Sequence, residues 1–423
     1  MTDVSERARA ILRGNDRGGY TVPTHRLYPF QWNWDSAFVA MGWATFDEAR
    51  GFTEVDRLLE GQWDDGLVPQ IVFHAASDDY FPGPAVWGVK HTPPTSGITQ
   101  PPVLASAVRF MLDHARDRAA AEARVAAIYP RLAAYHRWWR RARDPDGCGL
   151  VATLHPWETG MDNSPAWDAA LARVPTRTST AVQRRDLAHV DAAMRPRAAE
   201  YQRFIHLVDL FRDVGWRPDR MLAASPFRVA DIATNAILLR AESDLFALAR
   251  RFGEATEAGE IAARAACMRS AIEGLWNARL GVFHSLDLID RSPIEVATSA
   301  GLLPLYAGAA HASRAQAMAA TLRRWAGQVG YLVPSTAPDD ARFDALRYWR
   351  GPVWAVVNWM IAQGAAECGQ SDLAAELRRG TWEMIAGGGF SEYFDPRDGH
   401  GIGGRDFSWT AAIYLILADA GMS

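Results

Sequence analysis

The sequence predicts an all-α fold in which helical hairpins form a closed ring, and three observations support this class. Apolar residues recur at helical spacing along most of the 423-residue chain. Long stretches rich in Ala, Leu and Arg alternate with loops rich in Trp, Gly, Pro, Asp and His. The chain has no βαβ rhythm and no fixed repeat of about 34–45 residues, as an open solenoid would have. In a closed ring alternate loops meet at one end, so we expect one site there.

Turn signals bound the predicted helices. The stretch 119–142, for example, ends at the turn DPDG at 144–147. Short apolar runs at 68–73 and 281–286 fit strands or extended loop edges. The same helical periodicity predicts further helices at 104–115, 201–214, 231–252, 255–276, 294–307, 310–326, 353–368, 371–385 and 409–420.

No linker divides the chain, so we expect a single catalytic domain over residues 1–423. The segment 174–200 is polar, rich in arginine and poorly periodic. It is typical of an inserted flap, a lid over a site, and the loop 75–97 is a second candidate for closure. We expect both segments to become ordered when a ligand binds.

Composition excludes several classes of protein. The chain is 49% hydrophobic and 22% charged, which is enough apolar material for a large core. The net charge is −4 and the basic residues are dispersed, so we expect no nucleic-acid partner. No apolar run reaches 18 residues and the N-terminus lacks the apolar core of a signal peptide, so we expect no membrane contact.

Cysteine and histidine patterns bear on compartment and cofactors. The three cysteines, Cys148, Cys267 and Cys368, are scattered, which indicates a reducing cytoplasm rather than a disulfide framework. The histidines show no metal-ligand spacing, and no glycine-rich nucleotide loop exists, so we expect no metal and no cofactor. Helical faces alone leave homo-oligomer formation open.

Two loops carry isolated carboxylates beside aromatic residues. The first is HPWETGMDNSP at 155–165, where Asp162 stands five residues after Trp157. A neighbouring indole lowers the local dielectric and raises a carboxyl pKa, as a general acid needs. Asp162 could instead cap the helix that begins at the following Asn-Ser-Pro. Glu158 is the competing acid in this motif.

The second loop is GGGFSEYFDP at 387–396. Three glycines before Glu392 let backbone and water come close, and the aromatic residues after it would fix the loop. An exposed glutamate without function is the alternative. Together, Asp162 and Glu392 form the pair that hydrolysis of a glycosidic bond requires, one carboxyl holding a proton and the other ionised to activate water.

Two more motifs indicate sugar and anion binding. The run FQWNWD at 30–35 could form a rim that stacks on sugar rings and bonds hydroxyls, or a buried strand-like turn. The run RYWRGPVW at 347–354 places two arginines around aromatic residues, which suits an anionic group. For Arg350 a structural bridge to a carboxylate is the alternative. Most of the 17 tryptophans we assign to core packing.

These four motifs, in this order, resemble glycoside hydrolase family 63, and more narrowly its compact bacterial members that hydrolyse mannosylglycerate or glucosylglycerate. The resemblance covers essentially the whole chain. It implies an (α/α)6 barrel, an inverting mechanism, Asp162 as general acid and Glu392 as general base. It also implies that Trp34 and Asp35 bind the sugar and that Trp354 lines its pocket, while Trp157 lies beside the acid.

The resemblance also implies a site for glycerate. The residues that match it are Gln100, Tyr348, Arg195 and Tyr201, with Arg197 as an alternative to Arg195. The expected substrate is therefore a small glycoside, 2-O-α-mannosyl-glycerate first and the glucosyl compound second. The chain is too short for the extra β-sandwich domain of family members that trim N-glycans.

Two other functions stay open at this point. A trehalase-like enzyme or α-glucosidase would share the helical ring and the carboxyl pair, but a neutral aglycone would not need Arg195. A sugar-binding protein without activity would keep the aromatic loops but would not need Asp162 or Glu392 in its cavity. The sequence does not decide between mannose and glucose, which differ at one hydroxyl.

Overall fold

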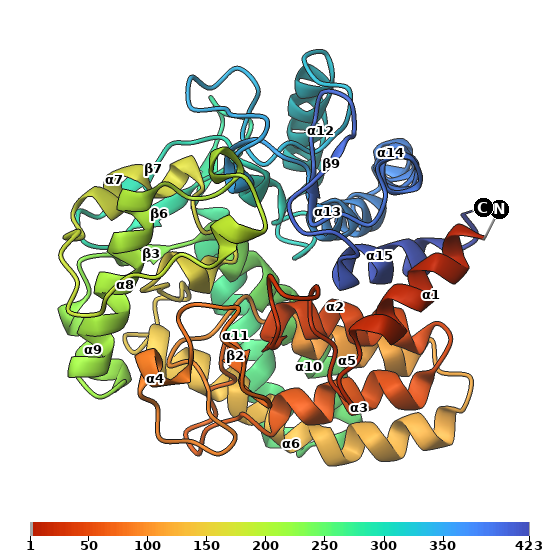
Figure 1. The fold of residues 1–423 in the computed structure, drawn as a ribbon. Helices are drawn as coiled ribbons and strands as arrows, with labels where there is room; N and C mark the ends of the chain where they lie inside the picture. The colour runs from red at the N-terminus through yellow and green to blue at the C-terminus, as the bar shows by residue number, and fades with distance from the viewer. Residues whose placement is uncertain (1–2, 423) are drawn as a thin grey trace.

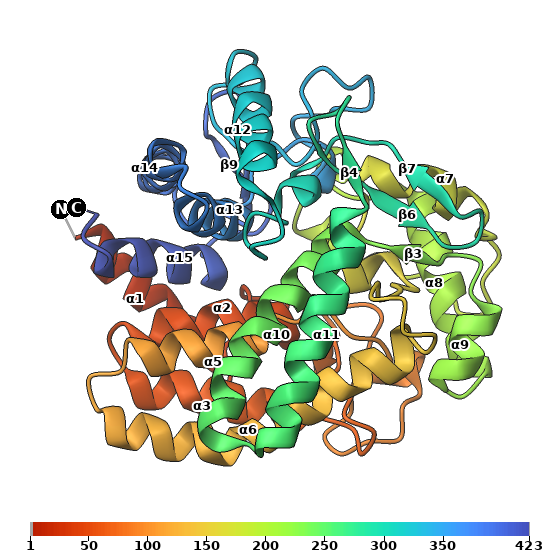
Figure 2. The same cartoon turned by 180° about the vertical axis from the view of Figure 1, so that it is seen from behind.

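The computed structural model describes residues 3–422 and is built mainly of helices arranged in two concentric rings (Figures 1 and 2). The inner segments α2, α5, α10 and η5 contact one another in this order, α13 contacts α15, and α15 packs against α2. Gly364 of α13 lies against Leu305 and Tyr306, just after η5, so the ring is closed. The inner segments are α2 (Asn33–Ala44), α5 (Leu104–Asp113), α10 (Ile232–Phe252), the 3-10 segment η5 (Ser299–Leu302), α13 (Ala355–Glu367) and α15 (Ser408–Asp419).

The outer ring packs on the inner one pair by pair, as in α2 with α3 and α13 with α14. Inner helices are apolar on most sides, whereas outer helices such as α11 bury a single stripe. Burial of the inner helices therefore builds the main core. The outer helices are α1 (Val4–Asn15), α3 (Glu48–Leu59), α6 (Arg118–Arg143), α11 (Ala255–Glu273), α12 (Ala312–Ala326) and α14 (Ser371–Gly388).

Short elements organise the loops at one end of the ring and enclose a second apolar cluster, which includes Trp87, Trp157 and Phe204. Four helices lie here, the short α4 (Pro84–Trp87), α7 (Asp168–Ala172) and α9 (Pro218–Ala224) and the longer α8 (Ala198–Asp213). The strands form antiparallel pairs and one three-stranded sheet: β1 (Gln31–Trp32) with β2 (Ile71–Val72); β3 (Val229–Ala230), β6 (Ser285–Asp287) and β7 (Ser292–Ile294); β4 (Trp276–Asn277) with β5 (Val282–Phe283); and β8 (Tyr393–Phe394) with β9 (Gly401–Ile402).

The predicted all-α fold, a ring of helical hairpins, is confirmed, with two local corrections. The helix expected at 294–307 is wrong, because this stretch ends β7 and continues as η5 and turns. Pro304 and the β-branched residues before it disfavour a continuous helix. The run 30–35, expected as a sugar-stacking rim or a buried strand-like turn, forms β1 and then the start of α2 at Asn33. Within residues 3–422, no helix has both the length and the apolarity needed to cross a bilayer.

Candidate active site

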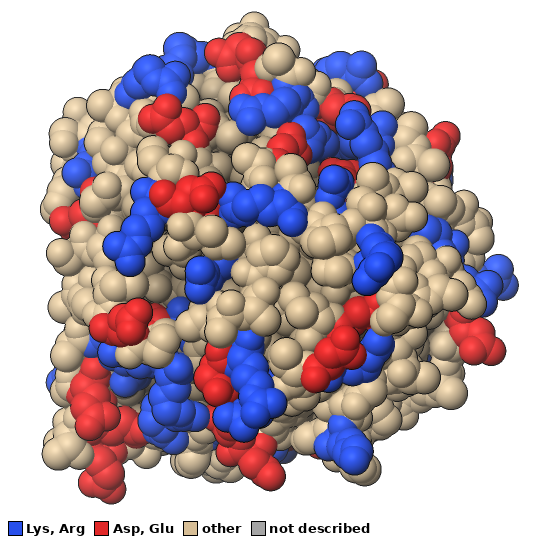
Figure 3. All heavy atoms as spheres, turned by 90° about the vertical axis from the view of Figure 1, so that its left-hand side faces the viewer, with Lys and Arg blue, Asp and Glu red and all other residues tan. Residues whose placement is uncertain are grey.

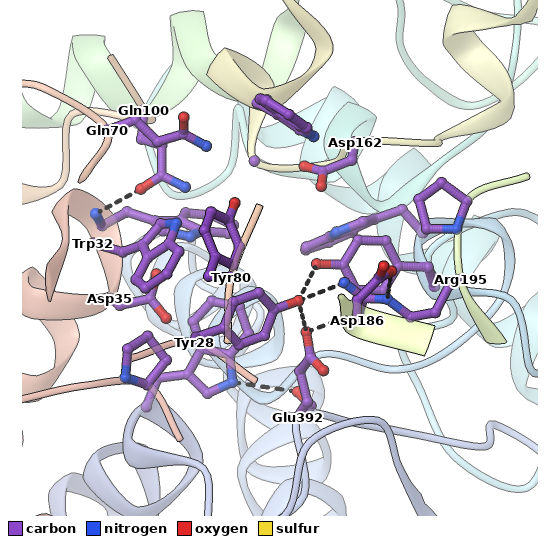
Figure 4. A pocket seen from close by; sticks show the side chains of 18 of the residues that line it. Tyr28, Trp32, Asp35, Gln70, Tyr80, Gln100, Asp162, Asp186, Arg195 and Glu392 are labelled. Carbon is purple, nitrogen blue, oxygen red and sulfur yellow. Dashed lines mark hydrogen bonds and ion pairs between the residues drawn. The ribbon is translucent and has the colours of Figure 1, made fainter. Parts of the chain in front are cut away.

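The loops at this end of the ring enclose a pocket of about 70 Å³ (Figure 4). Its wall combines aromatic rings with carboxyl groups and one arginine side chain. Of the residues that the sequence predicted for the site, all but Trp354 line it: Trp34, Asp35, Gln100, Trp157, Asp162, Arg195, Tyr201, Tyr348 and Glu392. Segments from both ends of the chain therefore meet in one cavity.

Asp162 lies in the loop between two 3-10 turns and is partly exposed, toward the cavity. Ser164, not Asp162, caps the following turn, and the Asn163 side chain accepts the Trp349 N–H at 2.9 Å. The Asp162 side chain makes no hydrogen bond to any residue in the described chain, so its role as a helix cap is wrong. Burial, with a smaller contribution from Glu392, raises its pKa to about 8.

Glu158, the competing acid, has a structural role. Its carboxylate accepts a hydrogen bond from Arg143 at 2.6 Å and another from the Leu154 N–H at 2.7 Å. Both Glu158 and Arg143 are buried, and neither lines the pocket. Asp162, and not Glu158, is therefore the acid of the motif that faces the cavity.

Glu392 precedes β8, and the hairpin of β8 with β9 brings Gly404 back beside it. The Gly404 N–H donates to Glu392 Oε2 at 2.9 Å, and the Tyr28 hydroxyl donates to Oε1 at 3.1 Å. Arg195 Nη1 lies 3.5 Å from the same Oε1. Burial raises the pKa of Glu392, while these three donors stabilise its ionised form and oppose the rise. In Figure 4, Glu392 and Asp162 lie on opposite sides of the cavity.

Arg195 enters the pocket from the irregular segment 174–197. Its guanidinium donates to the Tyr28 hydroxyl at 2.6 Å and to Asp186 at 3.3 Å, and it lies 4.2 Å from the centre of the Tyr348 ring. Arg197 is exposed at the N-terminus of α8. Of the two predicted candidates, Arg195 is therefore the arginine that faces the cavity.

Asp35 is a third carboxyl group in the pocket. It lies in the first turn of α2, which β1 leads into after pairing with β2. Its side chain bonds no other side chain of residues 3–422, although it is buried. Burial, together with Glu392 and Asp162, raises its pKa well above the usual range. A carboxyl group without a protein partner is available to bond a ligand hydroxyl.

The polar groups around the aromatic wall are already oriented. Gln100 accepts the backbone N–H of Trp34 at 3.4 Å, and the Tyr201 hydroxyl donates to the Phe81 carbonyl at 2.7 Å. The ring of Trp157 packs edge-on against Tyr201. These contacts hold the side chains in fixed positions before a ligand arrives, which lowers the cost of binding.

Trp354 was expected to line the pocket and does not. It lies one layer behind, stacked face to face on Trp349 with ring centroids 3.8 Å apart. Trp349 lines the cavity in its place. The chain turns through the 3-10 segment η6 (Tyr348–Arg350), where Tyr348 has φ of 40°, and Trp349 faces the cavity instead of Trp354, which the family resemblance had implied. Arg350 forms the structural bridge given as the alternative, at 2.8 Å to Asp168.

Several pocket residues were missed by sequence reasoning. Tyr28, which bonds Glu392 and Arg195, and Tyr80 come from loops that looked rich in chemistry, but no spacing singled them out. Asp186 belongs to the predicted flap, whose irregular sequence gave no signal for an ion pair with Arg195. Among the described residues, no group of three or more His, Cys, Asp or Glu could hold a metal ion.

A closed helical ring with opposed carboxyl groups in an aromatic pocket defines the class of the protein, a glycoside hydrolase. Residues 28–410 match the family described as the mannosylglycerate hydrolase MGH1-like glycoside hydrolase domain, and the chain belongs to this family. The resemblance to glycoside hydrolase family 63 that the motifs predicted is thereby confirmed.

Similar proteins cover nearly the whole chain. Mannosylglycerate hydrolase MGH1 from Selaginella moellendorffii is 50% identical over 97% of this chain and 84% of its own length. The crystal structure of the mannosylglycerate hydrolase from Thermus thermophilus in complex with Tris and D-glycerate has a TM-score of 0.96 and 46% identity, over 98% of this chain and 100% of that one. A glucosylglycerate hydrolase from Mycolicibacterium hassiacum is 35% identical over 98% of this chain and 97% of its own.

Proposed function

We propose that this chain hydrolyses a 2-O-α-glycosyl-glycerate to the free hexose and glycerate, with mannosylglycerate as the first substrate and glucosylglycerate as the second. One observation carries the proposal. A carboxyl group that keeps its proton near neutral pH lies across an aromatic pocket from a carboxylate held by Arg195, Tyr28 and the Gly404 N–H. The family and the names of these similar proteins agree with this substrate class.

In this mechanism Asp162 protonates the glycosidic oxygen while the bond to the anomeric carbon breaks. Glu392 takes a proton from a water molecule that attacks the opposite face of that carbon. Inversion needs room for the water, so the two carboxyl groups should be roughly 6.5–9.5 Å apart. Trp34 and Asp35 would hold the sugar, and Trp157 would shield Asp162 from solvent.

The glycerate end would lie at Arg195, with Gln100, Tyr201 and Tyr348 around it. Arg195 is the basic side chain on the pocket wall, and it contacts the proposed base as well. A bound carboxylate would compete with Glu392 and Asp186 for this guanidinium. A neutral aglycone, as in trehalose or maltose, would leave its charge unused, so Arg195 favours glycerate over those substrates.

The remaining surface fits a small substrate. On the face shown in Figure 3, acidic and basic side chains are interspersed and form no continuous basic stripe. The three cysteines are free, as suits the reducing cytoplasm that we propose as its location. We also propose that residues 1–423 act as one catalytic domain and that the segment 174–200 serves as its flap.

The test is a substrate panel of mannosylglycerate, glucosylglycerate, trehalose and maltose, with proton NMR of the first sugar released. Only the two glycosylglycerates should be cleaved efficiently, and the first product should be the β-anomer. Asp162→Asn and Glu392→Gln should each lower kcat by about 10²–10⁴-fold with an unchanged helical CD spectrum. Release of the α-anomer would refute Glu392 as general base, and efficient cleavage of trehalose alone would refute the substrate.

A further inference from the structure

A second cavity, of about 770 Å³, lies behind the loop that holds Glu392. Four segments form its walls: α1, the loop 24–27, residues 189–190 of the flap, and the loop 403–406. It opens on a different set of residues from the catalytic pocket and shares none of its lining. Its volume falls in the range of about 300–1,000 Å³ that is typical of small-molecule sites.

The charges on this cavity are mostly unneutralised. Arg7, Arg26 and Arg405 come from three separate segments, and none forms an ion pair with any carboxylate of residues 3–422. Arg7 lies over the Phe390 ring at 5.8 Å. Asp406 is the acidic side chain on the wall, and His25 already contacts Arg17 at 2.5 Å. Three guanidinium groups against one carboxylate leave a positive site, and guanidinium geometry matches an oxyanion.

The walls of this cavity continue directly into the catalytic pocket. Gly404 donates its N–H to Glu392, and the next residue, Arg405, lines the cavity. The Thr24 hydroxyl donates to the Arg405 carbonyl at 2.5 Å, which ties the two loops together. Arg26 precedes Tyr28, the donor to Glu392 Oε1, by two residues. An occupant would therefore fix the backbone that positions the proposed base.

The flap also reaches this cavity, through His189 and Val190. The same flap carries Arg195 into the catalytic pocket, and Tyr393 donates to the Met194 carbonyl at 2.9 Å. A ligand that contacts His189 on one side and the arginines on the other would bridge the flap to the body of the enzyme. Because the catalytic pocket is small, substrate access needs the flap to open, and such a bridge would oppose opening.

We infer that this cavity is a regulatory site for a phosphoryl group, either inorganic phosphate or the phosphate of a small metabolite, and that its occupant holds the flap closed and lowers the rate of hydrolysis. The binding depends on the arginines of the cavity alone, whereas the effect on turnover rests on the proposed function. If the chain did not hydrolyse glycosylglycerates, phosphate binding in this second cavity could still be tested.

Inorganic phosphate is the first probe, with a phosphorylated three-carbon acid as the second and sodium chloride of equal ionic strength as the reference. Binding is measured by calorimetry in the presence of saturating D-glycerate, which keeps phosphate away from Arg195. Hydrogen exchange of residues 174–197 reports flap opening. We expect phosphate to slow this exchange and to lower kcat/KM by about fivefold, the low end of usual allosteric couplings.

The variants Arg7→Gln and Arg405→Gln remove charge at exposed positions without touching the catalytic pocket. Each should weaken phosphate binding by about tenfold, the usual loss of one charge-assisted hydrogen bond. Arg220→Gln, at an exposed position on α9, is the matched control and should bind phosphate normally.

Equal phosphate affinity in all three variants would overturn the site. So would phosphate binding that D-glycerate abolishes, since this would place the anion at Arg195. Tighter binding of the phosphorylated acid than of inorganic phosphate would identify a metabolite as the occupant, and equal binding would identify free phosphate.

Discussion

At the scale of single residues, the pocket gives two carboxyl groups different chemistry through their surroundings. Asp162 faces the cavity with no hydrogen-bonded side-chain partner among residues 3–422, so burial raises its pKa more than the nearby charge of Arg195 lowers it. Glu392 is more deeply buried but receives three donors, one of them a guanidinium. Desolvation and charge pairing therefore suffice to separate an acid from a base in one cavity.

The raised pKa of Asp162 should lower the free energy of unfolding of the protein at neutral pH. Its pKa is about 8 in the folded chain and near the ordinary value of 3.8 when unfolded. Between these values the folded chain holds a proton that the unfolded chain releases, so stability falls as pH rises from about 4 to 8. We expect Asp162→Asn to be more stable than the parent by on the order of 2–3 kcal/mol at pH 7, allowing for partial exposure.

Thermal unfolding across pH 4–9 measures this difference. The melting curves of the two proteins should coincide near pH 4 and separate progressively up to about pH 8. A gap that is constant across this range would show that Asp162 does not titrate as proposed. Asp168→Asn and Asp219→Asn are not suitable controls, because Asp168 pairs with Arg350 and Asp219 pairs with Arg217. Asp339→Asn, at an exposed position that forms no ion pair among the described residues, is the control for the substitution itself.

At the scale of elements, the sequence predicts long helices well and special turns poorly. The stretch 119–142 corresponds to α6 within one residue at each end, because a long periodic pattern between turns admits one solution. The helix predicted at 294–307 is absent from the structure, since an apolar run can be buried by tertiary contacts without being a helix. Trp354 does not line the pocket as the family resemblance implied, because the chain turns at Tyr348, whose φ is positive, and Trp349 faces the cavity instead.

In the site too, the sequence predicts residues in distinctive local motifs and misses those that depend on long-range contacts. The motifs found Asp162 and Glu392, whose surroundings in sequence are unusual. They missed Tyr28, whose contact with Glu392 joins segments from opposite ends of the chain. Only closure of the ring, with α15 packed on α2, creates that contact. Pairings of this kind depend on the three-dimensional path of the chain and leave no local pattern.

Ring closure also depends on one close approach between elements. Gly364 in α13 lies against the backbone of Leu305 and Tyr306. These two residues belong to the turn that follows η5, where a helix over 294–307 was expected. A Cβ at this position would overlap that backbone, which cannot move as a side chain can. We expect Gly364→Ala to destabilise the protein by about 1–3 kcal/mol, although alanine is the better helix former.

Gly380 provides the matched comparison, because it is also inside a helix, α14, but a Cβ added there would have no neighbour within 4 Å. Gly380→Ala should stabilise the protein by about 0.5–1 kcal/mol. Chemical denaturation of both variants measures the two free energies of unfolding. If Gly364→Ala were as stable as Gly380→Ala, the contact between α13 and residues 305–306 would not constrain the ring.

For the whole molecule, the small size of the catalytic pocket determines how a substrate can enter it. A volume of about 70 Å³ is well below the roughly 300 Å³ of the smaller ligand sites, so the described conformation is closed. The proposed flap is bonded near its start to α8, where Asp209 accepts the Ser179 and Thr180 N–H groups. Near its end it is held by the bonds from Tyr393 to the Met194 carbonyl and from Arg347 to the Arg195 carbonyl at 3.0 Å. Opening should therefore be a movement of the flap, with the helical ring unchanged.

Limited digestion with trypsin tests this movement. Arg177 and Arg185 are exposed on the flap, and Arg291 is exposed in the turn between β6 and β7, away from the pocket. We expect D-glycerate, bound at Arg195, to slow cleavage at the two flap positions and leave Arg291 unchanged, because bound ligand stabilises the closed state. Arg195→Gln should cleave faster at the flap and lose this protection. Mass spectrometry of the fragments distinguishes the sites; equal protection at Arg291 would mean that ligand stabilises the whole molecule, and no protection anywhere would contradict a closing flap.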